Sequence, residues 1–285
     1  MTDADFDYIR KLLVDRSAIV LGDDKRYLVE ARLAPVIGQL NLPSISDLVG
    51  KLRFESNNGL ATRVVEALVT SETSFFRDIS PFEVLRKTVI PELIAARASE
   101  RKLTFWSATC STGQEPYTIA LTLREYFPEL ANWQITILGT DISTDVIAKA
   151  KQGVYSQFEA NRGLPAKLMV KYFQQSGTTW QLDAAIRNMV EFRQFNLAAA
   201  WPMLPKFDVI FLRNVMIYFD VSTKREILAR VERTLAPDGL LVLGGAETTL
   251  NLTEAFVRVE RMKAGYYQRV ARECGHTIIL RKSQS

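Results

Sequence analysis

Residues 103–127 place a strand, a loop of small residues and a helix one after another, and this order constrains the fold more than any other stretch. Leu103–Trp106 is a short apolar and aromatic run, which is typical of a buried strand. The small residues 111–113 break the run, and Pro116 favours the start of a helix because its fixed φ and missing N–H suit the first turn. We therefore expect the first unit of an α/β fold, with a ligand site at the carboxyl end of this strand.

The composition of this loop favours a ligand with an amino-acid group over a phosphate. A phosphate-binding loop carries Gly-x-x-x-x-Gly-Lys-Ser/Thr, and a dinucleotide-binding loop carries three glycines. Here the loop has one glycine, Gly113, and no lysine, and Glu115 stands at the expected start of the helix. A carboxylate repels a phosphate and attracts an ammonium group. The alternative is a tight turn that binds no ligand.

A second acidic residue is expected at the same edge of the sheet. A predicted strand at Trp133–Thr140 is followed directly by Asp141. An acidic side chain in this position accepts hydrogen bonds from the ribose hydroxyls of an adenosine ligand. Asp141 would alternatively cap a helix that begins near Ser143. Together with the Glu115 loop, the ligand-binding interpretation is the preferred one.

A further strand, Val209–Leu212, also ends in polar residues. Arg213 and Asn214 follow it directly, and Tyr218 comes four residues later. Strands that alternate with helices in this way predict a mostly parallel sheet covered by helices. The elements expected after this strand are a helix at Thr223–Leu235, a strand at Leu240–Leu243, and an antiparallel pair at Phe256–Arg261 and Gly265–Val270.

Residues 1–70 are predicted to form an all-helical amino-terminal domain. Apolar residues recur there at helical spacing, and Asp23 or Asp24 is a candidate N-cap of the second helix. Residues 71–98 are predicted as a linker followed by a helix. The linker is mostly polar, yet Phe75 and Phe76 stand side by side, so we expect it to pack against the rest of the protein.

Residues 99–272 are predicted as the α/β domain. An insertion at about 155–195 interrupts the alternation, and we expect it to form a small antiparallel sheet beside a helix. Its elements are predicted at Pro165–Phe173, Trp180–Leu182 and Arg187–Phe195. A mobile tail is expected at 273–285.

Composition excludes several classes of function. The single histidine, His276, excludes His-rich metal sites and leaves little scope for imidazole catalysis. Two cysteines, Cys110 and Cys274, fit a reducing cytoplasm better than a disulfide framework. The net charge of +4 comes without the dense basic stripe of a nucleic-acid binder. No apolar run reaches membrane-spanning length, so we expect no membrane insertion. We further expect a cytoplasmic monomer that binds neither a metal ion nor nucleic acid.

Five short motifs occur in order: Thr73-Ser-Phe-Phe-Arg-Asp, Ser111-Thr-Gly-Gln-Glu-Pro-Tyr, Thr140-Asp-Ile, Asn196-Leu and Arg213-Asn-Val-Met-Ile-Tyr-Phe. Together they resemble the CheR family of chemotaxis receptor methyltransferases, and the resemblance covers nearly the whole chain. It implies a Rossmann-like S-adenosylmethionine-dependent methyltransferase domain with a small inserted antiparallel β-subdomain, preceded by an all-helical domain. The implied activity is methyl transfer to glutamate side chains on the cytoplasmic helices of chemoreceptors, with S-adenosylhomocysteine as the product.

The resemblance also implies roles for individual residues. Arg77 and Tyr218 would border the transferred methyl group as catalytic residues. Glu115 would take the amino group of the cofactor and Asp141 its ribose. The full set of cofactor-binding residues would be Ser71, Thr73, Arg77, Glu115, Asp141, Asn196, Leu197, Arg213 and Asn214. Three places depart from the usual family pattern: Ser71 for Asn, Gln114 for Glu, and Gly244-Gly-Ala-Glu for Gly-His-Ser-Glu.

Expectations about partners follow from the same resemblance. Lys25, Arg26 and Arg32 would form a basic helix face for the acidic receptor, although a solvated face is the alternative. The turn at 176–179 is short, so we expect no dependence on a receptor carboxyl-terminal pentapeptide. Two other functions are weighed. A nucleic-acid methyltransferase would carry Asn/Asp-Pro-Pro-aromatic after the fourth strand, and a non-catalytic module would bind S-adenosylmethionine or another nucleotide without turnover.

Overall fold

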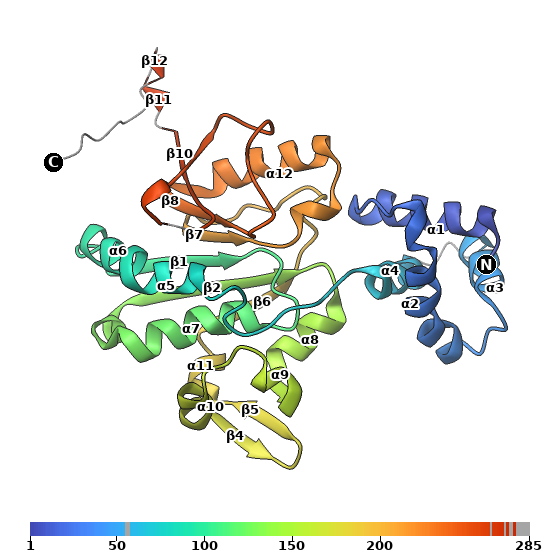
Figure 1. Cartoon of the computed structure of the whole chain (residues 1–285), viewed down its shortest axis with the longest axis horizontal. Coiled ribbons are helices and arrows are strands. Elements are labelled where there is room, and N and C mark those ends of the chain that lie inside the picture. The colour runs from blue at the N-terminus through green and yellow to red at the C-terminus, as the bar shows by residue number, and fades with distance from the viewer. Residues whose placement is uncertain (55–57, 263, 271, 274–275, 278–285) are drawn as a thin grey trace.

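A computed structural model describes residues 1–54, 58–262, 264–270, 272–273 and 276–277. The chain forms a helical amino-terminal domain and an α/β domain, with a small sheet attached to the latter (Figure 1). The predicted fold class is confirmed. The amino-terminal helices are α1 (Asp3–Ser17), α2 (Arg26–Gln39), α3 (Ile45–Phe54) and α4 (Asn58–Leu68).

The first helix has defined ends that the local sequence explains. Thr2 and Asp5 form a capping box at the start of α1, and Ala18 ends it in a left-handed conformation with φ of 56°. The prediction that Asp23 or Asp24 caps the second helix is wrong. Both belong to a 3-10 turn, η1 (Asp23–Lys25), and α2 begins after Lys25 without a side-chain cap.

A seven-stranded sheet with the order β6-β2-β1-β7-β8-β10-β9 forms the centre of the α/β domain. Its first five strands are parallel, and β10 and β9 pair in the antiparallel direction. The strands are β1 (Lys102–Ser107), β2 (Gln134–Asp141), β6 (Val190–Gln194), β7 (Phe207–Leu212), β8 (Leu235–Leu243), β9 (Phe256–Arg258) and β10 (Tyr266–Arg269). The chain runs outward from β1 and returns to β7 beside it. The carboxyl ends of β1 and β7 therefore mark the switch point where such sheets bind ligands.

Helices cover both faces of this sheet (Figure 1). One face packs against the segment formed by α5 (Ser80–Val84), a π-helical turn η2 (Leu85–Val89) and α6 (Ile90–Ala96), together with α7 (Gln114–Tyr126) and α8 (Thr144–Gln152). The other face packs against α12 (Val221–Thr234). All six residues of β7 are buried, as expected for a strand covered on both faces.

The small sheet has the order β3-β5-β4 and is antiparallel, as predicted. It consists of β3 (Val154–Ser156), β4 (Phe173–Ser176) and β5 (Thr179–Leu182), accompanied by α9 (Gln157–Asn161), α10 (Ala166–Tyr172) and α11 (Ala184–Arg187). The prediction that residues 187–195 belong to this sheet is wrong. That segment forms β6, which pairs in parallel with β2 of the main sheet, because Val190 and Phe192 face the main core.

The remaining described elements are short. They are η3 (Pro128–Asn132), η4 (Met216–Tyr218), η5 (Glu260–Met262), β11 (Arg272–Glu273) and β12 (His276–Thr277). The predicted mobile tail, 273–285, lies outside the described residues except for Glu273, His276 and Thr277. Among the helices of the described part, none combines the length and the apolar character that a bilayer crossing requires.

The linker packs tightly against the small sheet. The ring of Phe75 is fully buried, and its centroid lies 5.0 Å from that of Tyr155 and 5.7 Å from that of Phe173. Gly163 approaches the linker backbone closely: a Cβ built there would stand 2.0 Å from the Phe75 carbonyl oxygen. Its φ of 87° also disfavours any side chain. Only glycine fits at this contact, which fixes the linker beside the α/β domain.

We predict that Gly163→Ala destabilises the protein more than Gly177→Ala does. Both glycines have positive φ, but nothing lies within 4 Å of a Cβ built at Gly177. The control should cost about 1 kcal/mol from backbone strain alone. The Gly163 variant should cost about 1–3 kcal/mol more, because its methyl group must displace the linker. Urea denaturation measures both, and equal losses would contradict the tight contact.

Candidate functional site

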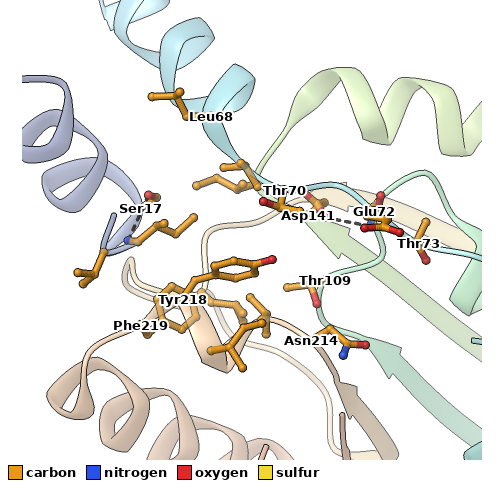
Figure 2. Close-up of a pocket in the computed structure, with 18 of the residues that line it drawn as sticks. Ser17, Leu68, Thr70, Glu72, Thr73, Thr109, Asp141, Asn214, Tyr218 and Phe219 are labelled. Carbon is orange, nitrogen blue, oxygen red and sulfur yellow. Dashed lines mark hydrogen bonds between the residues drawn. The ribbon is translucent and has the colours of Figure 1, made fainter. Parts of the chain in front are cut away.

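A cavity of about 360 Å³ opens at the carboxyl ends of β1, β2 and β7. The linker and the amino-terminal helices complete its walls, so both domains contribute to it (Figure 2). Figure 2 shows the ring of Tyr218 projecting into the cavity, with Ser17 on one side and Asp141 and Thr109 on the other. The predicted site residues that line it are Lys25, Arg32, Thr73, Arg77, Glu115, Asp141, Asn196, Leu197, Arg213, Asn214 and Tyr218.

Asp141 links the ends of two strands. One carboxylate oxygen accepts a hydrogen bond from the backbone N–H of Ser111 at 2.9 Å, and the other accepts one from the N–H of Ser143 at 3.1 Å. Ser143 itself is the N-cap of α8, since its hydroxyl accepts a hydrogen bond from the N–H of Val146. Burial raises the pKa of Asp141, and the bonds from backbone N–H groups oppose that shift. Each oxygen keeps a lone pair that a ligand hydroxyl can approach.

Glu115 is buried at the start of α7 and is already paired. One of its oxygens accepts a hydrogen bond from the Ser107 hydroxyl at 2.8 Å, and the other accepts one from Nη1 of Arg213 at 2.8 Å. A carboxylate accepts about four hydrogen bonds. Glu115 therefore retains acceptor capacity toward the cavity, where an ammonium group would be attracted.

Arg213 also binds the linker. Its Nη2 donates to the carboxylate of Asp78 and to the carbonyl of Arg77, both at 2.9 Å. Its Nε is the one buried side-chain nitrogen or oxygen without a hydrogen-bond partner in the described part of the chain. The guanidinium carbon lies 5.5 Å from the centroid of the Phe82 ring. This cation–π contact partly compensates for the missing hydrogen-bond partner of Nε. Arg213 therefore acts as a structural clamp as well as a lining residue.

The linker brings two predicted residues to the cavity and leaves one outside. Thr73 and Arg77 line it, and the guanidinium of Arg77 donates to the Glu72 carbonyl at 2.8 Å. Ser71 is exposed and does not line the cavity; its carbonyl accepts a hydrogen bond from the Ser111 hydroxyl. Ser71 therefore holds the loop that follows β1, and its side chain is not part of the wall.

Asn196 lines the cavity and also connects the two domains. Its amide nitrogen donates to the carbonyl of Arg16 at 2.7 Å, and its oxygen accepts from the N–H of Ala198 at 2.9 Å. These bonds attach the end of α1 to the α/β domain. Leu197 beside it is buried and supplies an apolar wall suited to a purine ring.

The three basic residues predicted to meet a receptor are all engaged within the protein. Arg26 forms an ion pair with Asp3 and does not line the cavity. Arg32 binds the Leu68 carbonyl and the Thr70 hydroxyl, and so holds the end of α4 and the linker. Lys25 pairs with its neighbour Asp24 at 2.8 Å. Only Lys25 combines a place at the cavity with a surface-exposed side chain.

The donor set suits S-adenosylmethionine and does not suit a metal ion. Two buried acids line the cavity, Glu115 at the start of α7 and Asp141 at the end of β2, and both retain acceptor capacity, one for an ammonium group and the other for ribose hydroxyls. Leu197 adds an apolar lining residue. Among the described residues, no group of three or more His, Cys, Asp and Glu side chains gathers as metal ligands do. Burial also raises the pKa of the nearby Cys110 thiol, which keeps it protonated and unreactive.

Comparison with known proteins identifies the family. Residues 4–69 match the model of the CheR methyltransferase all-alpha domain, and residues 71–264 match that of the CheR methyltransferase SAM binding domain. The chain belongs to the CheR methyltransferase family. Its cofactor class is therefore S-adenosylmethionine, in agreement with the geometry of the cavity.

Relatives of the same length support this assignment. Chemotaxis protein methyltransferase 1 of Pseudomonas aeruginosa is 40% identical, over 90% of this chain and 95% of that protein. Chemotaxis protein methyltransferase Cher2 of Pseudomonas putida is 39% identical, over 93% and 97%. Chemotaxis protein methyltransferase 1 of Vibrio cholerae is 35% identical, over 91% and 94%.

Sequence reasoning missed Glu247, which follows β8 and is buried. Its carboxylate accepts four backbone hydrogen bonds, three of them from the loop after β7. Residues 244–247 stand out in the sequence only as a departure from the family's Gly-His-Ser-Glu. The available signal was an acidic residue shortly after a buried strand, since Glu247 comes four residues after Leu243, the last residue of β8.

We predict that Asp141→Ala weakens the binding of S-adenosylhomocysteine at least about tenfold, because hydrogen bonds to a charged group contribute roughly 1.5–3 kcal/mol each. Asp145→Ala is the matched control, since Asp145 is exposed on the following helix. Calorimetry on both variants measures the two affinities. Unchanged affinity in the Asp141 variant would remove the ribose assignment.

Proposed function

We propose that this protein transfers the methyl group of S-adenosylmethionine to glutamate side chains on the cytoplasmic helices of chemoreceptors, forming glutamate methyl esters. The observation that carries the proposal is the match to both CheR domains, the helical one included. The names of the relatives, chemotaxis protein methyltransferases, point to the same substrate class. A chemoreceptor is cytoplasmic where it is methylated, which fits the expected location of the enzyme.

The cavity is suited to a nucleophile that is already charged. When bound, S-adenosylmethionine supplies a methyl group activated by a sulfonium centre. Among the described residues that line the cavity there is no histidine or cysteine. Its acids are all engaged: Glu115 and Asp141 accept hydrogen bonds, and Glu72 forms an ion pair with Arg162. A glutamate carboxylate needs no general base at neutral pH. The protein's contribution is alignment of the reacting atoms, which can supply about 7–11 kcal/mol.

Two residues are suited to orient the acceptor carboxylate. Arg77 is half-buried at the cavity, and its guanidinium keeps donors free beyond the one bound to the Glu72 carbonyl. The ring of Tyr218 enters the cavity from the loop after β7. We propose that Tyr218 donates a hydrogen bond to the acceptor carboxylate and that the positive charge of Arg77 attracts this carboxylate. Glu115 and Asp141 bind the cofactor.

We predict that the product is an ester released as methanol by mild alkali. Label from radioactive S-adenosylmethionine should appear on receptor protein in a membrane fraction and then become volatile. Alkali-stable label would indicate methylation at nitrogen or sulfur instead. Absence of transfer with intact cofactor binding would favour a non-catalytic binding module.

We predict that Tyr218→Phe lowers kcat about tenfold, because the hydrogen bond that aligns the acceptor carboxylate with the methyl group is lost. The affinity for S-adenosylhomocysteine should stay within about twofold, since the ring remains in place. Arg77→Ala should reduce turnover as well. Tyr126→Phe is the matched control, because Tyr126 is exposed and lies outside the cavity. A kcat equal to that of the control would remove Tyr218 from the mechanism.

We propose that the amino-terminal domain contacts the receptor and that Lys25 is the basic residue in this contact, since its side chain is both exposed and at the cavity. We predict that Lys25→Glu raises the receptor KM about threefold or more at low salt, with the difference shrinking as salt screens the charges. Lys11→Glu is the control, since Lys11 is exposed and pairs with Asp15 on α1. Equal KM values for the two variants would place the receptor contact elsewhere.

We predict that the protein acts on receptors without a carboxyl-terminal pentapeptide. The hairpin between β4 and β5 turns through Gly177 and Thr178 alone, so it offers little backbone to enclose a peptide. Trp180 is on β5, the middle strand of the small sheet, whose edges are β3 and β4. Titration with the family's tail pentapeptide should show no binding, and micromolar binding would refute the loop-length argument.

A further inference from the structure

The carboxylate of Glu247 accepts hydrogen bonds from four backbone N–H groups, although Glu247 lies outside the cavity. One oxygen accepts from Asn214 at 2.7 Å and from Gly244 at 2.8 Å. The other accepts from Val215 at 2.8 Å and from Met216 at 2.7 Å. Glu247 is only 9% exposed as a residue and is not among the residues lining the cavity. Such charge-assisted bonds are short and strong.

Three of these donors are consecutive, and they belong to the segment that carries Tyr218. Asn214 is left-handed, with φ of 59°, and this turns successive N–H groups toward one side. Successive N–H groups in this arrangement form a concave site for an anion. Here the protein's own carboxylate occupies it. The 3-10 turn η4 follows at once and ends with Tyr218.

The other contacts of residues 214–218 hold the ends of the turn, and Glu247 orients its first three peptide groups. Met216 and Phe219 are buried in the core on either side of Tyr218, which anchors the two ends of the turn. The carbonyl of Tyr218 accepts from the N–H of Val20 at 2.9 Å. Within the segment, the Val215 carbonyl accepts from the N–H of Tyr218 at 3.1 Å, which closes the turn on itself. The Glu247 carboxylate binds all three N–H groups of residues 214–216 and so connects the turn to the loop after β8.

We infer that Glu247 is a positioning residue for methyl transfer: it fixes residues 214–216 and thereby sets where the Tyr218 hydroxyl stands in the cavity. It touches neither the cofactor nor the acceptor. This inference rests on the proposed function, in which Tyr218 binds the acceptor carboxylate. A shift of about 1 Å in a group that aligns reactants can cost on the order of a hundredfold in rate.

The test is a double-mutant cycle on kcat with Glu247→Gln and Tyr218→Phe. The amide of Gln presents an NH2 group to two of the N–H donors, so the loop must shift although the side chain keeps its size. Glu247→Gln should lower kcat about tenfold to a hundredfold, with little change in the affinity for S-adenosylhomocysteine. In the Tyr218→Phe background the same change should cost less than about threefold, because the group that it displaces is already missing.

A second measurement needs no turnover. Hydrogen exchange on the free protein should show faster exchange at residues 214–218 in Glu247→Gln and unchanged protection in the main sheet. Glu254→Gln is the matched control, because Glu254 is exposed seven residues further along the chain. It should match the wild type in kcat and in exchange.

Gly244→Ala provides an independent variant in case Glu247→Gln does not fold. A Cβ at Gly244 would stand 2.7 Å from a Glu247 carboxylate oxygen and 3.0 Å from the Asn214 nitrogen, so it displaces the carboxylate without removing it. The same non-additivity with Tyr218→Phe is expected. Additive losses in a folded variant, or a kcat equal to that of Glu254→Gln, would overturn the inference. Failure of the wild type to form an alkali-labile ester would instead overturn the proposed function.

Discussion

The buried guanidinium of Arg213, which follows β7, joins the linker to the start of α7 at the cavity. It binds Glu115 at the start of α7, Asp78 in the linker, and the carbonyl of Arg77. Its own position follows from β7, a fully buried strand whose register is set by its neighbours on both sides. Removing one partner of such a buried ion pair costs on the order of 3–5 kcal/mol, because a charge is left uncompensated. The pair therefore orients the acid that is proposed to meet the cofactor's ammonium group before any ligand arrives.

Three non-glycine residues at or beside the same cavity have a left-handed backbone. Ser111, Asn214 and Asp78 are left-handed, with φ values of 50°, 59° and 62°. A non-glycine residue keeps this conformation only where the surrounding contacts demand it. Ser111 is held by the Asp141 carboxylate and Asn214 by the Glu247 carboxylate. The two carboxylates act alike: each accepts backbone N–H groups at the end of a strand and so gives a loop one defined shape.

Much of this arrangement could be predicted from sequence because buried strands and charged strand ends are local signals. Val209–Leu212 is uniformly apolar, Asp141 ends the strand β2, and Glu115 stands at the start of the helix that follows β1. These local signals predict both acids at the same edge of the sheet. The segment at Arg187–Phe195 was assigned to the wrong sheet, because alternating residues predict a strand and do not say which neighbour it pairs with. Glu247 was missed because its partners are backbone groups about 30 residues earlier. Nearly every residue has a backbone N–H group, so the sequence does not show which of these groups bind a given carboxylate.

The amino-terminal domain is part of the site and not merely attached to it. Val20 donates its N–H to the carbonyl of Tyr218, Asn196 binds the carbonyl of Arg16, and Arg32 holds the linker. Leu68 and Ser17 reach the cavity wall from this domain (Figure 2). A ligand that touches both walls stabilises the arrangement in which they meet, and the linkage is reciprocal. A receptor helix that binds the amino-terminal domain in this arrangement must therefore tighten cofactor binding by the same factor by which the cofactor tightens receptor binding.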